Sequence, residues 1–478
     1  MNKLLLAKPP DNDKRSGMAL VMAALSLIVL VPMLGLAIDG SNVYLMRNRI
    51  NTAMDAAVLA AARSLNVGKT VAQQNAAAIV IAQAEFSADT SAVPNISWPS
   101  SGPSAPVFTI ADSANHYRTV NGTVTVQLPL TFISLIPGIN YATISVATAA
   151  TRRDVNIVMV LDDGYPMSNV GGGSNVTPLT TLQTDAVAFV NLFANNRDNI
   201  GLVTFTSAAA VADALPNQNF LSNVPNDINS LTAAGQGGPN TSAGLEAAYQ
   251  QLQNLNHQGA LNVIVLFTDG IPTGFSGDFG TLLTSSQNTC VATGGHLSGA
   301  LWLLPIPQST PLQGNGAGLT DPTIQNGAAQ ENYDASSVAA PGCPGGISAR
   351  PASLLTGMPS VDLFNNATIG SYPPAPVTLN GITAQNIVNA SENALDAAAN
   401  RIRSDTSLQP VIFAIGLDGN LTLQPDPILM AKIANDPSSA YYNSSQPTGQ
   451  SIIAPSTAQL QSAFSSIASQ VLRLAAAH

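Results

Sequence analysis

The sequence predicts an α/β protein built around a doubly wound, mostly parallel sheet. Two apolar runs rich in Val and Ile, VNIVMVLDD from Val155 and LNVIVLFTDG from Leu261, are typical of strands buried on both faces of such a sheet. Between them, two stretches with helical character (residues 177–193 and 237–252) flank a third strand at residues 200–205. This alternation of strand and helix is typical of a parallel sheet whose connections are helices.

Each of the two apolar strands ends on an acid, Asp162 in the first and Asp269 in the second. In open α/β sheets the ligand crevice lies outside the carboxyl ends of the strands. Two carboxylates there could hold one hard divalent cation, because Mg²⁺ takes carboxylate and hydroxyl oxygens and keeps several waters. The alternative is that both acids are solvated or cap nearby helix N-termini.

From about Asp154 to the C-terminus, with one long interruption, this order of strands with acids at their tips resembles a von Willebrand factor A-type domain. The metal site of that family reads D-x-S-x-S, then a Thr in a GGTN-like turn, then an Asp in a TDG-like turn. In this chain the two Ser positions are Gly164 and Pro166, and the Thr position is Pro239. Neither Gly nor Pro has a side-chain oxygen, so three of the five ligand positions are lost.

Two acids of the family pattern remain, Asp162 and Asp269. Asp163, Ser168 and Thr241 lie close in sequence and could substitute as ligands, although no spacing rule supports them. We therefore expect no resident cofactor beyond a weakly bound Mg²⁺.

The N-terminal part predicts a membrane anchor. Basic residues at positions 3, 8, 14 and 15 precede a charge-free run over residues 16–38, which is long enough to span a bilayer as a helix. The basic flank predicts a single pass through the inner membrane, with the N-terminus in the cytoplasm and the bulk of the chain outside. The alternative is a signal peptide cleaved after Gly-Leu-Ala at residues 35–37, but the run exceeds the usual apolar core of about 7–15 residues.

The anchor and its Ala-rich continuation to Leu65 resemble the N-terminal segment of TadE/TadG-like proteins of the Flp (tight adherence) pilus assembly system. The matching features are the basic RSG before the span, the run from Ala37-Ile38-Asp39 to Tyr44, and NTAMDAAVLAAA from Asn51. The resemblance implies a structural or assembly role, with pilus-assembly or envelope proteins as partners. Met22 replaces the Glu of prepilin-like members, so we do not expect processing by a prepilin peptidase.

These patterns divide the chain into three parts. Residues 1–65 form the basic tip, the anchor and its helical continuation, and residues 66–153 form a helix and a small β-rich module that alternates with period two. Residues 154–478 form the sheet domain, with a loop-rich insertion at about 272–379. The insertion holds the two cysteines, Cys290 and Cys343, which we expect to be bridged in an exported chain, the alternative being two free thiols.

Composition and motifs exclude several classes of partner and activity. The net charge of −10 argues against nucleic acid or anionic lipid as the main partner. The sequence has no GxSxG elbow, HExxH helix or phosphate-binding GxxxxGK[ST] loop, so we expect no enzyme. Two functions stay open: a membrane-anchored periplasmic component of a Flp-type pilus that acts through protein–protein contacts, and a metal-dependent adhesin-like domain displayed on the envelope. The three lost ligand positions favour the first.

Overall fold

The computed structural model describes residues 13–68, 70–91, 96–114, 116–135, 138–168, 176–233, 238–278, 298–303, 317–320, 325–326, 350–351, 357–370, 384–418 and 424–476. The chain forms two compact units. The first comprises Met1–Ser64, Ala76–Ala111 and Thr119–Ala150, and the second comprises Leu65–Asn75, Asp112–Arg118 and Thr151–His478. The three-part division expected from the sequence stays a prediction.

The first unit contains most of two helices and a three-stranded sheet. The helices are α1 (Asp13–Arg63) and α2 (Val71–Thr90), and the strands, in the order β1-β2-β3, are β1 (Val107–Ser113), β2 (Tyr117–Pro129) and β3 (Tyr141–Arg153). A short 3₁₀ turn, η1 (Ile133–Leu135), lies between β2 and β3. The anchor and its continuation are one helix of 51 residues, and Pro32 lies inside it.

The two halves of α1 differ in burial. In the second half, Met46, Ile50 and Ala57 are buried at helical spacing. Gly122 of β2 allows a close approach there, since a Cβ on it would lie 2.7 Å from the side chain of Met54. The apolar first half is exposed: only 6% of its most hydrophobic window is buried, and among the described residues this is the one helix long and apolar enough to cross a membrane.

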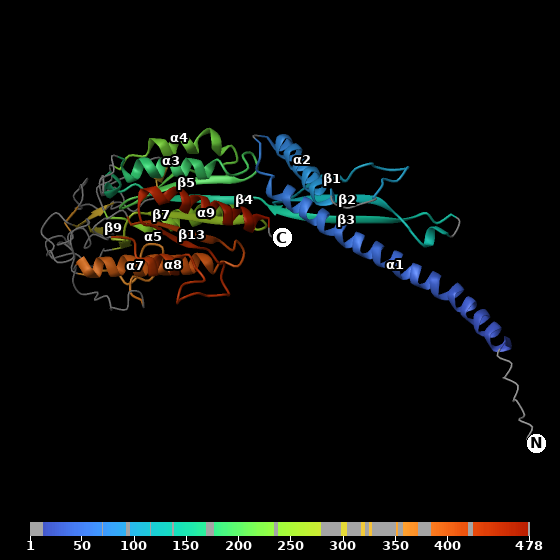
Figure 1. Cartoon of the computed structure of the whole chain (residues 1–478). Helices are drawn as coiled ribbons and strands as arrows, with labels where there is room; N and C mark the ends of the chain where they lie inside the picture. The colour runs from blue at the N-terminus through green and yellow to red at the C-terminus, as the bar shows by residue number, and fades with distance from the viewer. Residues whose placement is uncertain are drawn as a thin grey trace, which may run out of the picture. The chain divides into compact units, whose positions relative to one another are not determined.

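The second unit is built on a seven-stranded sheet in the order β11-β6-β5-β4-β7-β13-β14 (Figure 1). Its parallel strands are β5 (Asn199–Phe205), β4 (Val155–Asp162), β7 (Leu261–Thr268), β13 (Val411–Leu417) and β14 (Ser451–Ala454). The strand β6 (Ala209–Asp213) runs antiparallel to β5, and β11 (Gln325–Asn326) pairs parallel with β6.

Helices cover both faces of this sheet, which confirms the predicted doubly wound fold. One face carries α3 (Pro178–Val190), η3 (Phe220–Ser222), α4 (Val224–Ser230) and α9 (Thr457–Ala475), and the other carries α5 (Thr241–Leu255), α7 (Ala384–Arg403) and α8 (Pro427–Ile433). Alternate residues of β4 face the two cores: Ile157 and Met159 face one, and Val158 and Val160 face the other.

The predicted insertion contains strands that the sequence analysis missed. An antiparallel sheet in the order β12-β10-β9-β8 consists of β12 (Arg350–Pro351), β10 (Ala317–Thr320), β9 (Ser298–Leu303) and β8 (Gly274–Asp278). These strands are short and rich in Gly and Ser, so they lack the Val and Ile signal of the central strands. Cys290 and Cys343 lie outside the described residues, and their bridge stays a prediction.

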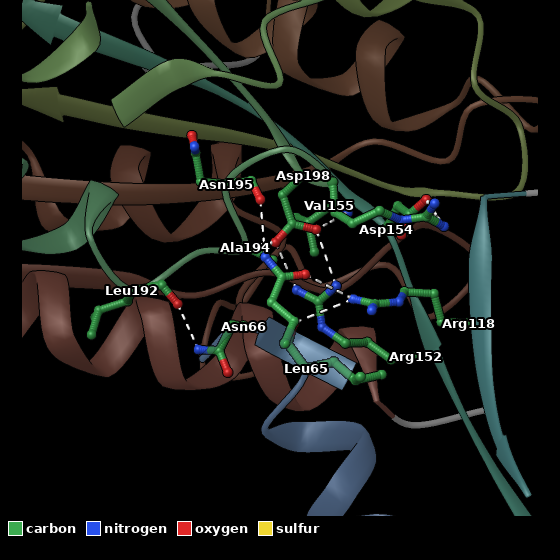
Figure 2. A network of polar contacts seen from close by, with 12 residues as sticks. Leu65, Asn66, Arg118, Arg152, Asp154, Val155, Leu192, Ala194, Asn195 and Asp198 are labelled. Atoms are coloured by element: carbon green, nitrogen blue, oxygen red, sulfur yellow. Dashed lines mark hydrogen bonds and ion pairs between the residues drawn. The ribbon is translucent and has the colours of Figure 1, made fainter. Parts of the chain in front are cut away.

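A buried polar network in the second unit surrounds Asp198, in the turn before β5 (Figure 2). Arg152 donates to both carboxylate oxygens of Asp198, at 3.1 and 2.7 Å. The same carboxylate accepts from the N–H groups of Val155 at 3.0 Å and Ala194 at 2.8 Å. The side chains of this ion pair are 1% and 0% exposed, so the pair is fully desolvated and fully hydrogen-bonded.

The two short segments that join this unit from the N-terminal part of the chain are held by similar contacts (Figure 2). Arg118 donates to the carbonyl of Leu65 at 3.3 Å, and Asn66 donates to the carbonyl of Leu192 at 2.7 Å. These segments are therefore part of the sheet unit, although they are distant from it in sequence.

Candidate functional site

The two acids predicted from the sequence lie at one edge of the main sheet. Asp162 is the last residue of β4, and Asp269 directly follows β7. Because β4 and β7 are adjacent parallel strands, with Leu161 opposite Phe267, their carboxyl ends meet at the same edge. Asp162 is 1% exposed and Asp269 is 2% exposed, so both carboxyl groups are buried.

The two carboxyl groups differ in their hydrogen bonds. Asp162 accepts from the N–H of Gly164 at 3.0 Å through Oδ1 and from the hydroxyl of Thr268 at 2.8 Å through Oδ2. Oδ2 of Asp269 has no hydrogen-bond partner among the described residues. Asp162 is therefore held in place by the protein, whereas one oxygen of Asp269 is left to interact with something else.

Burial raises the pKa of both acids. It raises the pKa of Asp162 to about 6, against the opposing effect of the hydrogen bonds from Gly164 and Thr268. Burial, followed by the nearby charge of Asp162, raises the pKa of Asp269 well above its usual value. A cation at this edge would favour the ionised form of both groups.

Three hydroxyl groups share this part of the sheet. Thr206 and Ser207 follow β5, and Thr241 is the first residue of α5. Their side-chain oxygens are buried and have no hydrogen-bond partner among the described residues. Asn240 links the two segments, because its N–H donates to the carbonyl of Thr206 at 2.6 Å and its side chain donates to the carbonyl of Ser207 at 3.1 Å.

Neither Gly164 nor Pro239 contributes a side-chain ligand. Gly164 uses its N–H on Asp162, and Pro239 is buried, with its carbonyl accepting from the N–H groups of Thr273 and Gly274 at 3.0 Å each. Among the other residues considered as substitutes, Asp163 donates its N–H to the carbonyl of Phe205 at 3.2 Å, and Ser168 lies in the 3₁₀ turn η2 (Tyr165–Ser168).

The donors at this edge are carboxylate and hydroxyl oxygens, which suit a hard cation such as Mg²⁺. Within the described part of the chain, no group of three or more His, Cys, Asp or Glu side chains is placed to hold a metal ion. Four buried side-chain oxygens at this edge, those of Asp269 (Oδ2), Thr206, Ser207 and Thr241, have no hydrogen-bond partner among the described residues.

Thr206 and Ser207 were not singled out from the sequence. The signal was present, because both directly follow an apolar strand, as Asp162 and Asp269 do. The rule that places ligands at the carboxyl ends of parallel strands applies to β5 as well.

Two family models match the chain. Residues 17–64 match a model described as putative Flp pilus-assembly TadE/G-like, and residues 157–271 match the von Willebrand factor type A domain. Both resemblances expected from the sequence are confirmed. The chain joins a segment similar to TadE/G-like pilus-assembly proteins with a domain similar to von Willebrand factor type A domains.

Solved structures with a similar fold include pilus proteins. A variant of the PilB minor pilin from Streptococcus sanguinis is 17% identical, with 77% of this chain and 78% of that chain covered and a TM-score of 0.36. The vWF domain of the type V pili tip protein Mfa5 from Porphyromonas gingivalis is 18% identical, with 68% and 97% covered and a TM-score of 0.36. Proximal thread matrix protein 1 from the mussel byssus, with a zinc-occupied MIDAS motif, is 9% identical, with 66% and 47% covered and a TM-score of 0.32.

At these identities and TM-scores, the similarities carry no argument about this chain. No curated protein matches the chain.

Proposed function

We propose that this protein is a membrane-anchored structural component in the assembly of a Flp-type pilus. One observation carries the proposal: a single chain joins a TadE/G-like segment at residues 17–64 to a von Willebrand factor A-type domain. Residues 17–38 span the inner membrane, residues 1–16 lie in the cytoplasm, and the chain after the span lies on the periplasmic side. The role is structural rather than catalytic, and the partners are pilus-assembly or envelope proteins.

Two features support the anchor. The side chains of Leu20, Leu25 and Leu30 are 72%, 55% and 53% exposed, so this part of α1 has an apolar surface to place in lipid. The four basic residues before the span favour a cytoplasmic N-terminus.

Complementation of a deletion strain tests the proposal. We expect the full chain to restore surface pili. A form whose residues 1–38 are replaced by a cleavable signal peptide should be exported but should fail to restore them. Pili restored to the normal level by this released form would contradict an anchored role, and pili retained in the deletion strain itself would contradict any role in assembly.

A second candidate function is metal-dependent binding, in which a cation completes its coordination with a carboxylate of a partner. The partnerless oxygens of Asp269, Thr206, Ser207 and Thr241 favour it. The acids would attract the cation, and the hydroxyl oxygens would add donors. Gly164, Pro166 and Pro239 supply no side-chain oxygen where the family pattern has Ser, Ser and Thr, so we expect binding no tighter than the millimolar range.

Calorimetric titration of the full chain with Mg²⁺ tests this candidate. Micromolar binding that is abolished by Asp162→Ala would favour metal-dependent adhesion over the structural role. Protonation competes with the metal at the raised pKa values, so any binding should weaken as the pH falls below about 6.

A further inference from the structure

Between β2 and β3 the first unit presents an apolar tip, which we define as residues 130–135 and 138–141. The tip contains no charged residue, and the N–H of Leu130 closes it by donating to the carbonyl of Asn140 at 3.1 Å. Three of its large side chains are exposed: Phe132 by 38%, Ile139 by 45% and Tyr141 by 50%. Exposed apolar groups that cluster on one turn indicate a surface that is covered in the working protein.

The tip is fixed to one level of α1, and the two lie side by side (Figure 1). Phe132 packs on Gly35, where an added Cβ would lie 2.6 Å from the Cβ of Phe132. Four residues further along α1, the carboxylate of Asp39 accepts from the N–H groups of Thr131 at 3.0 Å, Phe132 at 2.8 Å and Ile133 at 2.7 Å.

The contact at Asp39 explains how an acid is tolerated directly after the span. Asp39 is the first charged residue after the charge-free run over residues 16–38, yet it is only 2% exposed. A carboxylate at the edge of a hydrocarbon layer is costly unless hydrogen bonds replace its water. The three N–H groups of the tip supply those hydrogen bonds.

The level of this contact is set by helix geometry. At about 1.5 Å per residue, the run over residues 16–38 is about 35 Å long, compared with a hydrocarbon core of about 30 Å. Gly35 lies three residues before the end of that run, hence about 5 Å along the axis. The tip is therefore level with the boundary between hydrocarbon and headgroups on the C-terminal side of the span.

We propose that the tip is a second membrane contact, in which Phe132, Ile139 and Tyr141 enter the interfacial layer of the bilayer beside α1. The inference rests on the proposed membrane anchor. The exposed apolar surface of the span continues onto the tip without a charged residue between them. Aromatic rings with one polar end, as in Tyr141, suit the headgroup level.

Because the apolar surface is continuous from the span to the tip, we infer that lipid covers the tip. Leu34 and Leu36, on the same stretch of α1, are 62% and 61% exposed and belong to the span that lipid surrounds. A protein partner that covered the tip at this level would have to displace that lipid. Apolar groups held at this depth gain free energy by leaving water for the interface.

Single-tryptophan forms of the full chain test the proposal after reconstitution into phosphatidylcholine vesicles. In a background with Trp98→Phe and Trp302→Phe, one tryptophan is placed by Leu25→Trp in the span, by Tyr141→Trp in the tip, or by Tyr442→Trp in the second unit. Tyr442 is 40% exposed, which matches the tip, and no lipid contact is proposed for it. Ile139→Trp is a second tip variant in case Tyr141→Trp disturbs the start of β3.

Quenching by lipids that carry bromine at a shallow or a deep position on the acyl chain reports the depth of each tryptophan. We expect Leu25→Trp to lose most emission with deep bromine. Both tip variants should lose most emission with shallow bromine, and their emission maximum should shift to the blue. Tyr442→Trp should show neither the loss nor the shift.

Quenching at Leu25→Trp without quenching at either tip variant would overturn the tip contact while leaving the anchor intact. A blue shift at the tip without quenching would also overturn it, because protein and not lipid would then cover the side chains. Absence of quenching at Leu25→Trp would overturn the anchor, and the tip contact with it.

Discussion

Asp162 and Asp269 hold protons at a pH where the unfolded chain has released them. Burial raises the pKa of both, to about 6 for Asp162, above an ordinary value of 3.8. Above about pH 4 the folded state therefore binds more protons than the unfolded state. In the absence of a cation, the stability that depends on protonated Asp162 is fully present below about pH 4 and is lost as the pH rises through about 6. The stability that depends on protonated Asp269 is lost in the same way as the pH rises through the raised pKa of that group.

Asp269→Asn should therefore stabilise the second unit at pH 7.5 in the presence of a chelator. The substitution removes a buried carboxylate that is repelled by Asp162, and we expect a gain of about 1–3 kcal/mol in the free energy of unfolding. Hydrogen exchange of peptides from β4 and β7 in the detergent-solubilised full chain measures the gain.

The gain should largely disappear near pH 4, where the folded state keeps both carboxyl groups protonated and the unfolded state, with an ordinary pKa of about 3.9, has itself taken up about half of those protons. Asp278→Asn, at an exposed acid of β8, is the matched control and should change the free energy by less than about 0.5 kcal/mol at either pH. An equal gain at pH 4 and pH 7.5 would show that charge is not the cause.

The residues at this edge of the sheet also show which features of the site could be predicted from the sequence. Asp162 and Asp269 follow strands with a strong Val and Ile signal, so their meeting at one edge could be predicted. The burial that leaves Thr206 and Ser207 without partners depends on the contacts of Asn240, which is more than thirty residues away in sequence. No local sequence pattern predicts such a contact.

At the scale of elements, long periodic segments were predicted well and short ones were missed. The strands β4, β5 and β7 and the helices α3 and α5 carry enough apolar residues to be recognised alone. The strands β6 and β14 have five and four residues, and α4 and α8 have seven each. Elements of this length are stabilised by the neighbours on which they pack rather than by their own propensity.

The contact between α1 and the β2–β3 tip requires a glycine at position 35. Gly35→Ala should loosen this contact, because the new Cβ would meet Phe132 at 2.6 Å. Overpacking of this kind costs about 1–3 kcal/mol. We expect faster hydrogen exchange over the tip.

Gly40→Ala is the matched control, since nothing lies within 4 Å of a Cβ at that position. In a helix this change should be neutral or stabilising by up to about 1 kcal/mol. Equal exchange in the two variants would mean that the tip does not depend on close approach at Gly35.

Arg152, near the end of β3, pairs with Asp198 in the turn before β5, and Asp198 also accepts from the N–H of Val155 at the start of β4. Arg152→Ala would leave the carboxylate of Asp198 buried without its cation, which typically costs about 3–5 kcal/mol. Exchange of β4 and β5 peptides should report this loss. The matched control is Arg473→Ala, at an exposed arginine of α9, which should change the free energy of unfolding by less than about 0.5 kcal/mol. An equally small effect of Arg152→Ala would contradict the structural role of the pair.

At the scale of the whole molecule, the sheet unit contains two short segments that are distant from it in sequence. The sheet unit includes Leu65–Asn75 and Asp112–Arg118, which lie before the first strand of the predicted domain. Their inclusion depends on single hydrogen bonds, such as that from Asn66 to the carbonyl of Leu192. Composition and periodicity report where an element begins, but they do not report which distant backbone group a polar side chain will reach.

The whole chain should stay in the membrane after carbonate extraction, with its N-terminus intact. A charge-free run over residues 16–38 is long enough to cross the hydrocarbon core, and the described residues bury only 6% of the most hydrophobic window of its helix. Intact mass spectrometry of the extracted membrane fraction distinguishes this outcome from cleavage after Ala37, which would shorten the chain by 37 residues. Recovery of the intact chain in the soluble fraction would show that the run does not anchor the protein. A membrane form that lacks residues 1–37 would show that the run is a signal peptide and that another segment holds the protein at the envelope.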